Sequence, residues 1–221
     1  MNAAAHPGEP PAGRRRIGLY GGSFDPVHQA HLALAQLALR TLQLDELRWI
    51  PAGQPWQKRR ELAPPQHRAG QIEALLAELA EPRFVLERCE LDRPGPSYTL
   101  ETVRALQAAN PPAEWFLILG ADQVCNLHTW FGWEELLQRV TLAVAAREGC
   151  EPEPAAQLQA RAPRIELLRL PQMPLSSTRI RALLAAGTDP QALAPALVAP
   201  AVAGYIARHR LYGATTSDRS S

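Results

Sequence analysis

The chain has 221 residues, 46% of them hydrophobic and 20% charged, which is typical of a folded globular protein with one large domain or two small ones. Lys and Arg number 23 and Asp and Glu 22, and this balance argues against broad electrostatic binding to nucleic acid or an anionic membrane. The three cysteines form no close pair, which favours a reduced, cytoplasmic setting.

Neither a targeting signal nor a membrane span is recognisable along the chain. Residues 1–13 lack an apolar run and are predicted to be a disordered tail, and residues 214–221 are predicted to be a flexible one. The longest uncharged stretch, 190–207, is interrupted by Pro195 and Pro200, so it indicates soluble helix and turn. The folded domain is therefore expected within residues 14–213.

Short apolar runs alternate with amphipathic stretches throughout this domain. In chain order the predicted elements are strand 17–20, helix 32–42, strand 47–50, helix 72–79, strand 84–86, helix 99–109, strand 115–119, helix 130–139, strand 141–145, strand 165–170, helix 178–186 and helix 197–207. Residues 52–65 and 149–162 are predicted to be loops. Strands that alternate with helices indicate βαβ units and a parallel sheet. The sequence therefore predicts a single doubly wound, Rossmann-like α/β domain.

In a doubly wound sheet, ligands bind beyond the carboxyl ends of the strands, where the strand order reverses. The chemistry is therefore expected just after Tyr20, Ile50, Leu119 and Leu170. The unusual residues of this chain follow those positions.

The first such segment is Gly21-Gly22-Ser23-Phe24-Asp25-Pro26-Val27-His28-Gln29-Ala30-His31. Two glycines after a strand let backbone N–H groups approach an anion closely. His28 and His31 are three residues apart at the start of a helix, so both rings face the same way and can donate to phosphate oxygens. The alternatives are an ordinary strand–turn–helix with two surface histidines, or half of a metal site.

Two further segments end later strands. Ser176, Ser177 and Arg181 open a predicted helix, where hydroxyls are ordinary N-caps but also suit a phosphate when an arginine lies one turn inside. Gly120 and Asp122 follow strand 115–119, where an acid can accept hydrogen bonds from ribose hydroxyls or cap the next helix.

Together these spacings resemble the nucleotidyltransferase superfamily that shares its fold with class I aminoacyl-tRNA synthetases. Its signatures are G-G-[ST]-F-D-P-x-H-x-G-H near the N-terminus and an I-S-S-T-x-I-R-like run near the C-terminus. Within it, residues 16–213 resemble the bacterial nicotinate-nucleotide adenylyltransferase family. The supporting segments are Ile50-Pro51-Ala52-Gly53-Gln54-Pro55-Trp56-Gln57-Lys58, Pro96-Ser97-Tyr98-Thr99-Leu100-Glu101-Thr102, Leu119-Gly120-Ala121-Asp122 and Leu127-His128-Thr129-Trp130.

Three positions depart from the family pattern. Ala30 replaces the usual Gly between the histidines, and Leu175 replaces the customary Ile. Gln57 stands where an imidazole often precedes the basic residue, which makes Lys58 the more important anion contact. None of these changes removes a group that the chemistry needs.

The resemblance implies transfer of AMP from ATP to nicotinate mononucleotide, which gives nicotinate adenine dinucleotide and pyrophosphate in NAD synthesis. The attacking phosphate is already charged, so positioning and charge neutralisation can carry the reaction without a general base. Mg²⁺ is expected on the triphosphate, with few protein ligands.

The resemblance also implies the site residues. The catalytic residues would be His28, His31 and Arg181. ATP would meet Gly21, Gly22, Ser23, Phe24, Lys58, Gly120, Asp122, Ser176 and Ser177. The nicotinate pocket would be formed by Tyr98, Thr99 and Trp130, with the indole stacked on the pyridine ring. For Trp130 the alternative is a core aromatic side chain.

Other functions stay open at this stage. A related enzyme that uses nicotinamide mononucleotide or phosphopantetheine would share both end motifs, and only the middle segments argue against it. A non-catalytic nucleotide sensor on the same fold is disfavoured by the intact His28, His31 and Arg181. A nucleic-acid binder would depend on the short clusters 14–16 and 58–60, which the net charge does not support. The partners expected are ATP and nicotinate mononucleotide, and a homo-oligomer is compatible with the sequence.

Overall fold

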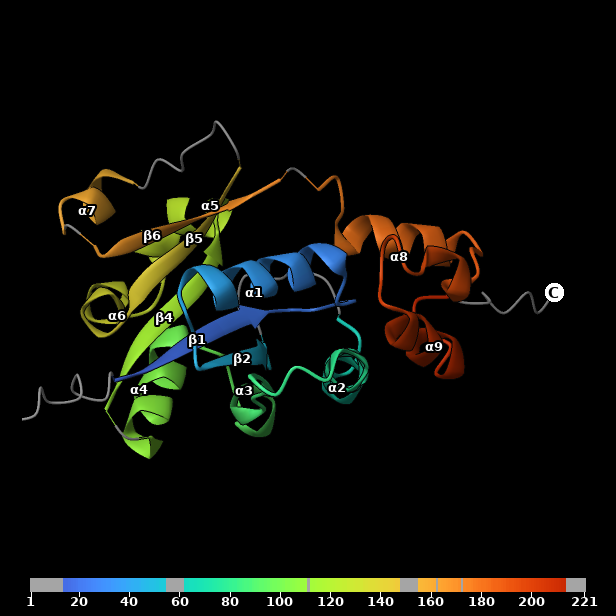
Figure 1. Cartoon of the computed structure of the whole chain (residues 1–221), viewed down its shortest axis with the longest axis horizontal. Helices are drawn as coiled ribbons and strands as arrows, with labels where there is room; N and C mark the ends of the chain where they lie inside the picture. Colours follow the sequence, from blue (N-terminus) through green and yellow to red (C-terminus); the bar gives the residue numbers. More distant parts are fainter. Residues whose placement is uncertain are drawn as a thin grey trace, which may run out of the picture.

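The computed structural model describes residues 14–54, 62–110, 112–147, 155–161, 163–171 and 173–213. The predicted tails, 1–13 and 214–221, lie outside the described residues. Within these ranges a parallel sheet runs through the middle of the molecule, with helices on both of its faces (Figure 1). Its strands are β1 (Arg15–Gly22), β2 (Glu46–Pro51), β3 (Phe84–Leu86), β4 (Ala113–Gly120), β5 (Thr141–Arg147) and β6 (Ile165–Leu170).

The strand order is β3-β2-β1-β4-β5-β6, with every neighbouring pair parallel. The chain builds outward from β1 to β3 and then returns to the other side of β1 with β4. This reversal lies between β1 and β4, where Tyr20 pairs with Ile118. The doubly wound α/β fold predicted from the sequence is confirmed, and its crevice falls at the carboxyl ends of these two strands.

Helices cover both faces because each presents an apolar stripe to the sheet. One hydrophobic cluster joins the sheet to α1 (Gln29–Thr41), α2 (Pro65–Leu79), α8 (Ser177–Ala185) and α9 (Pro200–Arg208). A second cluster joins the opposite face to α4 (Thr99–Ala109), α5 (Ala121–Cys125), α6 (Trp133–Arg139) and α7 (Ala156–Gln159). The remaining short elements are α3 (Cys89–Asp92) and the 3₁₀ turns η1 (Leu127–Thr129) and η2 (Pro190–Leu193).

Two predicted helices begin three residues later than expected. The helix predicted over 130–139 begins at Trp133, because Gly132 adopts a left-handed backbone with φ of 63° that ends the preceding turn. A Cβ at Gly132 would lie 2.2 Å from Cδ2 of Leu100, so the close approach of α4 also requires glycine there. The helix predicted over 197–207 begins at Pro200, since proline suits the first position of a helix. Trp130 therefore lies in an irregular segment that faces the crevice.

Candidate active site

The glycines of the first motif, Gly21 and Gly22, are the last two residues of β1, which runs two residues beyond the end of the predicted strand, and with Ser23 and Phe24 they form the glycine loop. A Cβ at Gly21 would meet nothing within 4 Å, so this edge of the loop is open to a ligand. At Gly22 the added atom would lie 2.9 Å from the ring of Phe24, which packs beneath it. The Phe24 ring itself is only 1% exposed and contacts Tyr20 and Trp49. The backbone of this loop, rather than the Phe24 side chain, is therefore available to a nucleotide.

The two histidines face the same way at the start of α1, as their spacing predicted, and their rings stack. Their ring centroids are 3.6 Å apart at an interplanar angle of 18°. The backbone N–H of His28 donates to Nδ1 of His31 over 3.2 Å, so the proton of a neutral His31 ring lies on Nε2. His31 is thereby prepared to donate from Nε2.

Burial keeps both imidazoles neutral in the absence of ligand. It lowers the pKa of His28 to about 4, against an opposing hydrogen bond at its backbone. Burial also holds the pKa of His31 well below its ordinary value, and the neighbouring His28 adds to that effect. Both rings therefore act as neutral hydrogen-bond donors near pH 7, not as fixed positive charges.

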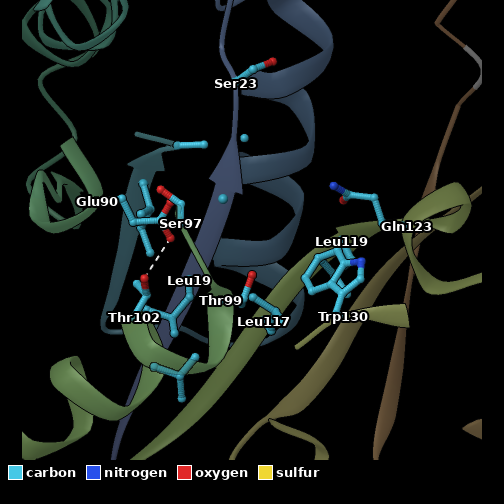
Figure 2. Close-up of a pocket in the computed structure, with 15 residues that line it drawn as sticks. Leu19, Ser23, Glu90, Ser97, Thr99, Thr102, Leu117, Leu119, Gln123 and Trp130 are labelled. Atoms are coloured by element: carbon cyan, nitrogen blue, oxygen red, sulfur yellow. Dashed lines mark hydrogen bonds between the residues drawn. The ribbon is translucent and has the colours of Figure 1, made fainter. Parts of the chain in front are cut away.

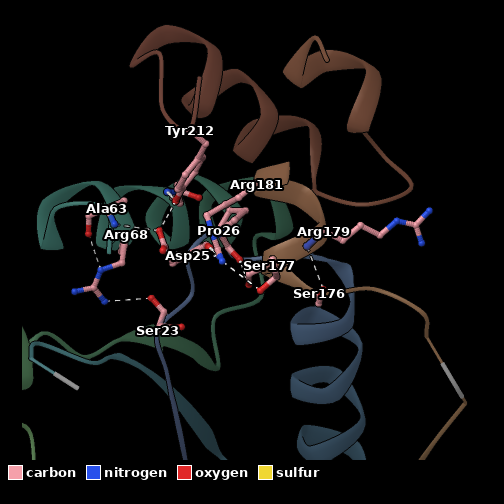
Figure 3. A network of polar contacts seen from close by, with 12 residues as sticks. Ser23, Asp25, Pro26, Ala63, Arg68, Ser176, Ser177, Arg179, Arg181 and Tyr212 are labelled. Atoms are coloured by element: carbon pink, nitrogen blue, oxygen red, sulfur yellow. Dashed lines mark hydrogen bonds and ion pairs between the residues drawn. The ribbon is translucent and has the colours of Figure 1, made fainter. Parts of the chain in front are cut away.

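The start of α8 is bound to the loop after β1 (Figure 3). Ser177 Oγ donates to the carbonyl of Pro26 over 3.0 Å, and Arg181 donates to the carbonyl of Asp25 over 2.6 Å. Ser176 Oγ accepts the Arg179 N–H at 3.2 Å as the N-cap, so its own proton can serve a ligand. The hydroxyl proton of Ser177 is already used by Pro26, so Ser177 holds the loop in place.

Gly120 and Asp122 lie at the carboxyl end of β4, beside the end of β1. Asp122 is exposed in the first turn of α5. The Gly120 N–H donates to Oε1 of Gln123 at 3.0 Å, which fixes the orientation of that amide. Gln123 lines the pocket described next, and its Nε2 donors are not used by this bond.

A pocket opens beside the glycine loop, across the crevice between β1 and β4 (Figure 2). The Trp130 indole lies on one side, and Glu90, Ser97 and Thr102 lie on the other. Nε1 of Trp130 is buried with no hydrogen-bond partner among the described residues. The lining residues are Leu19, Gly21, Gly22, Ser23, Ile50, Ala52, Glu90, Ser97, Thr99, Thr102, Val103, Leu117, Leu119, Gln123 and Trp130.

The N-terminus of α4 faces this pocket through Ser97 and Thr99. Tyr98 is its N-cap, and within the described residues no side chain caps the helix. The first N–H groups of a helix have no partner inside the helix, and the helix dipole favours an anion beside them. The pocket therefore combines an aromatic wall with a helix end suited to a carboxylate.

Ser97 connects this helix end to the loop after β2. Its Oγ accepts the N–H groups of Gly53 and Gln54 at 3.1 and 3.3 Å. Glu90 lies beneath it and accepts from Thr102 Oγ1 at 2.8 Å. Burial raises the pKa of the Glu90 carboxyl, while hydrogen bonds from Thr102 and Ser97 oppose that shift. The sequence reasoning missed Glu90, because an acidic residue four positions before a Pro-Gly-Pro turn looks like a surface residue.

Arg68 is a second residue that the sequence reasoning missed. Its guanidinium is buried and donates to the carbonyls of Ala63, Ser23 and Gly53 at 3.0, 3.1 and 3.3 Å. It thereby joins the loops after β1 and β2 to the start of α2. Nothing in the local sequence distinguishes this arginine from an exposed helix residue.

The structure brings most of the predicted site residues to one edge of the sheet. Gly21, Gly22, Thr99 and Trp130 line one pocket, Ser176 and Arg181 lie together at the start of α8, and the two histidines stack at the start of α1. Tyr98 does not line the pocket, since its ring packs 4.9 Å from that of Phe131. Lys58 lies outside the described residues.

Two further findings concern the described part of the chain. It contains no group of three or more His, Cys, Asp or Glu residues able to hold a metal ion together. Among those residues, no helix is both long and apolar enough to cross a membrane.

Comparison with known proteins identifies the family and the fold. Residues 19–183 match the cytidylyltransferase-like family, and the chain belongs to it. The fold resembles that of a Plasmodium falciparum nicotinic acid mononucleotide adenylyltransferase complexed with NaAD, with a TM-score of 0.72, 19% identity, and coverage of 90% of this chain and 97% of that chain.

Closer relatives define the particular family. A probable nicotinate-nucleotide adenylyltransferase of Methylibium petroleiphilum is 54% identical, over 90% of this chain and 93% of its own length. Relatives of the same name from Bordetella petrii and Symbiobacterium thermophilum are 46% and 38% identical, over 90% and 89% of this chain and 99% and 95% of theirs. The chain is therefore a member of the nicotinate-nucleotide adenylyltransferase family, as its motifs indicated.

Proposed function

We propose that the protein transfers AMP from ATP to nicotinate mononucleotide, releasing pyrophosphate and forming nicotinate adenine dinucleotide. The observation that carries this proposal is the arrangement at the crevice. The glycine loop at the end of β1 lies between a polyphosphate side, built from His28, His31 and α8, and a pocket that ends at α4 and Trp130. A loop with backbone N–H groups between two such sites suits the joining of two phosphates.

The reaction needs positioning more than proton transfer. A phosphate oxygen of the mononucleotide attacks the α-phosphorus of ATP, and the bond from that phosphorus to the oxygen bridging to the β-phosphate breaks. The attacking oxygen is already anionic near pH 7, so no general base is required. Charge that develops on the departing pyrophosphate must be stabilised, which is the task of preorganised donors.

On the polyphosphate side the proposed donors are His31, His28, Ser176 and Arg181. The Nε2–H of His31 and the free hydroxyl proton of Ser176 both follow from the hydrogen bonds within the protein. Lys58 is proposed to meet the same phosphates, and Gly120 and Asp122 to meet the adenosine.

On the pocket side we assign the nicotinate carboxylate to the N-terminus of α4. Backbone N–H groups there only donate, so they satisfy a carboxylate better than an amide, whose NH₂ would meet another donor. Trp130 stacks on the pyridine ring, an interaction that does not depend on the substituent. Ser97 keeps the helix end against the loop after β2 through its bonds to Gly53 and Gln54.

Mg²⁺ is proposed to arrive with the triphosphate. The donors on the polyphosphate side are N–H and O–H groups, which fit phosphate oxygens and leave the metal to be held by the phosphates themselves. When bound, the ion neutralises part of the charge that builds up on pyrophosphate. A cytoplasmic location, the absence of a nucleic-acid partner and the oligomeric state stay predictions.

The test is an assay of pyrophosphate release with ATP and a panel of acceptors. The panel contains nicotinate mononucleotide, nicotinamide mononucleotide and phosphopantetheine, each at equal concentration. We expect kcat/KM for nicotinate mononucleotide to exceed that for the nicotinamide form by about 100-fold, because an unpaired buried donor costs roughly 1–3 kcal/mol and the ionic part adds to it. Equal kcat/KM values for the two mononucleotides would overturn the assignment of nicotinate mononucleotide as substrate. Pyrophosphate release with phosphopantetheine alone would make phosphopantetheine the substrate instead.

A further inference from the structure

A tyrosine close to the C-terminal end of the described chain contacts the first motif. Tyr212 lies beyond α9, and its hydroxyl donates to Oδ1 of Asp25 over 2.8 Å. Asp25 follows the glycine loop and is fully buried. Figure 3 shows the Tyr212 ring reaching down from the C-terminal segment to the side of Asp25 that faces Arg181. Two segments 187 residues apart in the sequence thus meet beside the polyphosphate side of the site.

The direction of this hydrogen bond is fixed by a third residue. Nε2 of Gln71, in α2, donates to the Tyr212 hydroxyl over 2.9 Å. Because that oxygen accepts from Gln71, its single proton is directed at Asp25. Burial raises the pKa of the Tyr212 phenol, and the charge of Asp25 raises it further. Tyr212 therefore stays a protonated donor across the physiological pH range.

Asp25 in turn contacts Arg181 through two different groups. The Arg181 guanidinium donates to the backbone carbonyl of Asp25 at 2.6 Å, while its nearest approach to the carboxylate, at Oδ2, is 4.0 Å. Oδ1 of the carboxylate is satisfied by Tyr212 and by the N–H of Ala63 at 3.3 Å. A buried carboxylate that loses such a donor is stabilised most readily by the nearest cation. In the part of the chain that the structure describes, Arg181 is the cation with an ion-pair contact to this carboxylate.

We propose that Tyr212 is a positioning residue for Arg181. By donating to Oδ1 of Asp25, it leaves Arg181 held by the Asp25 carbonyl and by Thr178 Oγ1, where its guanidinium can meet bound polyphosphate instead of closing onto the carboxylate. The inference rests on the proposed function in one respect, that Arg181 meets the phosphates of ATP. It adds the C-terminal segment, which lies beyond the matched residues 19–183, to the ATP site.

The test compares Tyr212→Phe with a matched control, Tyr205→Phe. Both substitutions remove one hydroxyl from a tyrosine at the C-terminal end of the chain, and Tyr205 contacts His67 of α2 at 3.3 Å, not Asp25. ATP binding is measured by calorimetry without any mononucleotide, so the result does not depend on which acceptor is used. We expect the dissociation constant for ATP to rise about 10-fold in Tyr212→Phe, as for loss of one hydrogen bond to a charged group, and to stay at the wild-type value in Tyr205→Phe.

A double variant separates positioning from general support of the fold. Tyr212→Phe should have no further effect on ATP binding in an Arg181→Ala background, because its influence passes through that side chain. Urea unfolding of each variant shows whether the fold is kept. If Tyr212→Phe does not fold, Gln71→Met, which removes the donor that directs the hydroxyl, is expected to weaken ATP binding in the same direction by a smaller factor.

Three outcomes would overturn the proposal. They are wild-type ATP affinity in folded Tyr212→Phe, an equal loss in Tyr205→Phe, and an undiminished effect of Tyr212→Phe when Arg181 is absent. A wild-type protein that binds ATP but transfers AMP to no mononucleotide would contradict the proposed function and leave this test intact.

Discussion

The helices α8 and α4 both begin at the carboxyl edge of the sheet, yet their N-termini are built differently. At α8 the Ser176 hydroxyl caps the helix, and Ser177 and Arg181 bind it to the glycine loop. At α4 no side chain among the described residues caps the helix, and its N–H groups face a pocket with an aromatic wall. An end held by side chains suits a flexible polyphosphate, whereas bare N–H groups distinguish a carboxylate from an amide. Turnover is therefore expected to depend on the α8 side and substrate choice on the α4 side.

The largest effect on turnover is expected on the α8 side, where charge on the departing pyrophosphate would be stabilised. His31→Ala should lower kcat about 100-fold or more, because it removes a donor aimed at charge that develops in the transition state. His28→Ala should lower kcat less, since the His28 ring stacks on His31 and the His31 donor stays in place. Turnover measured at saturating ATP and mononucleotide checks both values. The control is His209→Ala, at an exposed histidine that follows α9 and whose ring lies beside His67 and Tyr205.

Both histidine variants should keep their fold, because α1 retains its buried apolar face. Wild-type turnover in both variants would mean that the stacked pair has no catalytic role and would remove the functional contrast between the two helix ends.

The second largest effect is expected for Arg181→Ala. This variant should raise KM for ATP roughly 10- to 100-fold and leave KM for the mononucleotide unchanged. The reason is the loss of hydrogen bonds from a charged group to phosphate, each worth roughly 1.5–3 kcal/mol. Lys58→Ala is expected to act in the same direction. Initial-rate kinetics with each substrate varied in turn separate the two constants. ATP kinetics like those of the wild type in both variants would argue against a polyphosphate site at this end of the sheet.

A smaller effect, about 10-fold, should appear at α4 when one backbone donor is removed. Thr99→Pro deletes the N–H at the first helical position, which proline tolerates, and Tyr98 already has the extended backbone that precedes a proline. The ratio of kcat/KM between the nicotinate and nicotinamide mononucleotides should fall from about 100 to about 10. The acid should lose affinity while the amide is nearly unaffected.

Two variants control for the lost side chain and for stacking. Thr99→Val keeps the N–H and should keep the ratio. Trp130→Ala should weaken both mononucleotides by a similar factor, since stacking is indifferent to the substituent. An unchanged ratio in Thr99→Pro would move carboxylate recognition away from this helix end.

The sequence predicted the sheet well because its signals are local. The apolar runs at 17–20, 115–119 and 165–170 lie within β1, β4 and β6. The spacing of the two histidines predicted that their rings face the same way, and the structure shows that they stack. The edge of the sheet that carries the site was predicted from one rule, that ligands bind beyond the carboxyl ends of the strands in a doubly wound parallel sheet. The particular family was recognised from motif spacing, and the relatives confirmed it.

What the sequence could not predict depends on contacts between distant segments. Tyr212 meets Asp25 across 187 residues, and Arg68 meets Gly53 and Ser23 through backbone carbonyls, which carry no residue-specific signal. Trp130 was expected inside a helix, because the helical periodicity of the sequence includes it. The helix begins only at Trp133, since Gly132 adopts a left-handed backbone. Buried polar networks are decided by the packing of the whole domain, so a local pattern does not reveal them.

The smallest predicted effect concerns the protonation of the histidine pair and tests whether the α8 side works with neutral donors. The pKa of His28 is about 4 in the folded protein because of burial, against about 6.5 in an unfolded chain. Between pH 6.5 and 4 the unfolded state binds a proton at His28 that the folded state does not. The free energy of unfolding therefore decreases as the pH falls from 6.5 toward 4. When the pH falls from 7.5 to 5.5, the contribution of His28 should therefore lower the free energy of unfolding of the wild type by about 1 kcal/mol. Urea unfolding of wild type and His28→Gln at both pH values measures the difference. The difference in unfolding free energy between the two proteins should change by that amount in favour of the variant at pH 5.5. A difference independent of pH would mean that His28 has the same pKa in the folded and the unfolded protein.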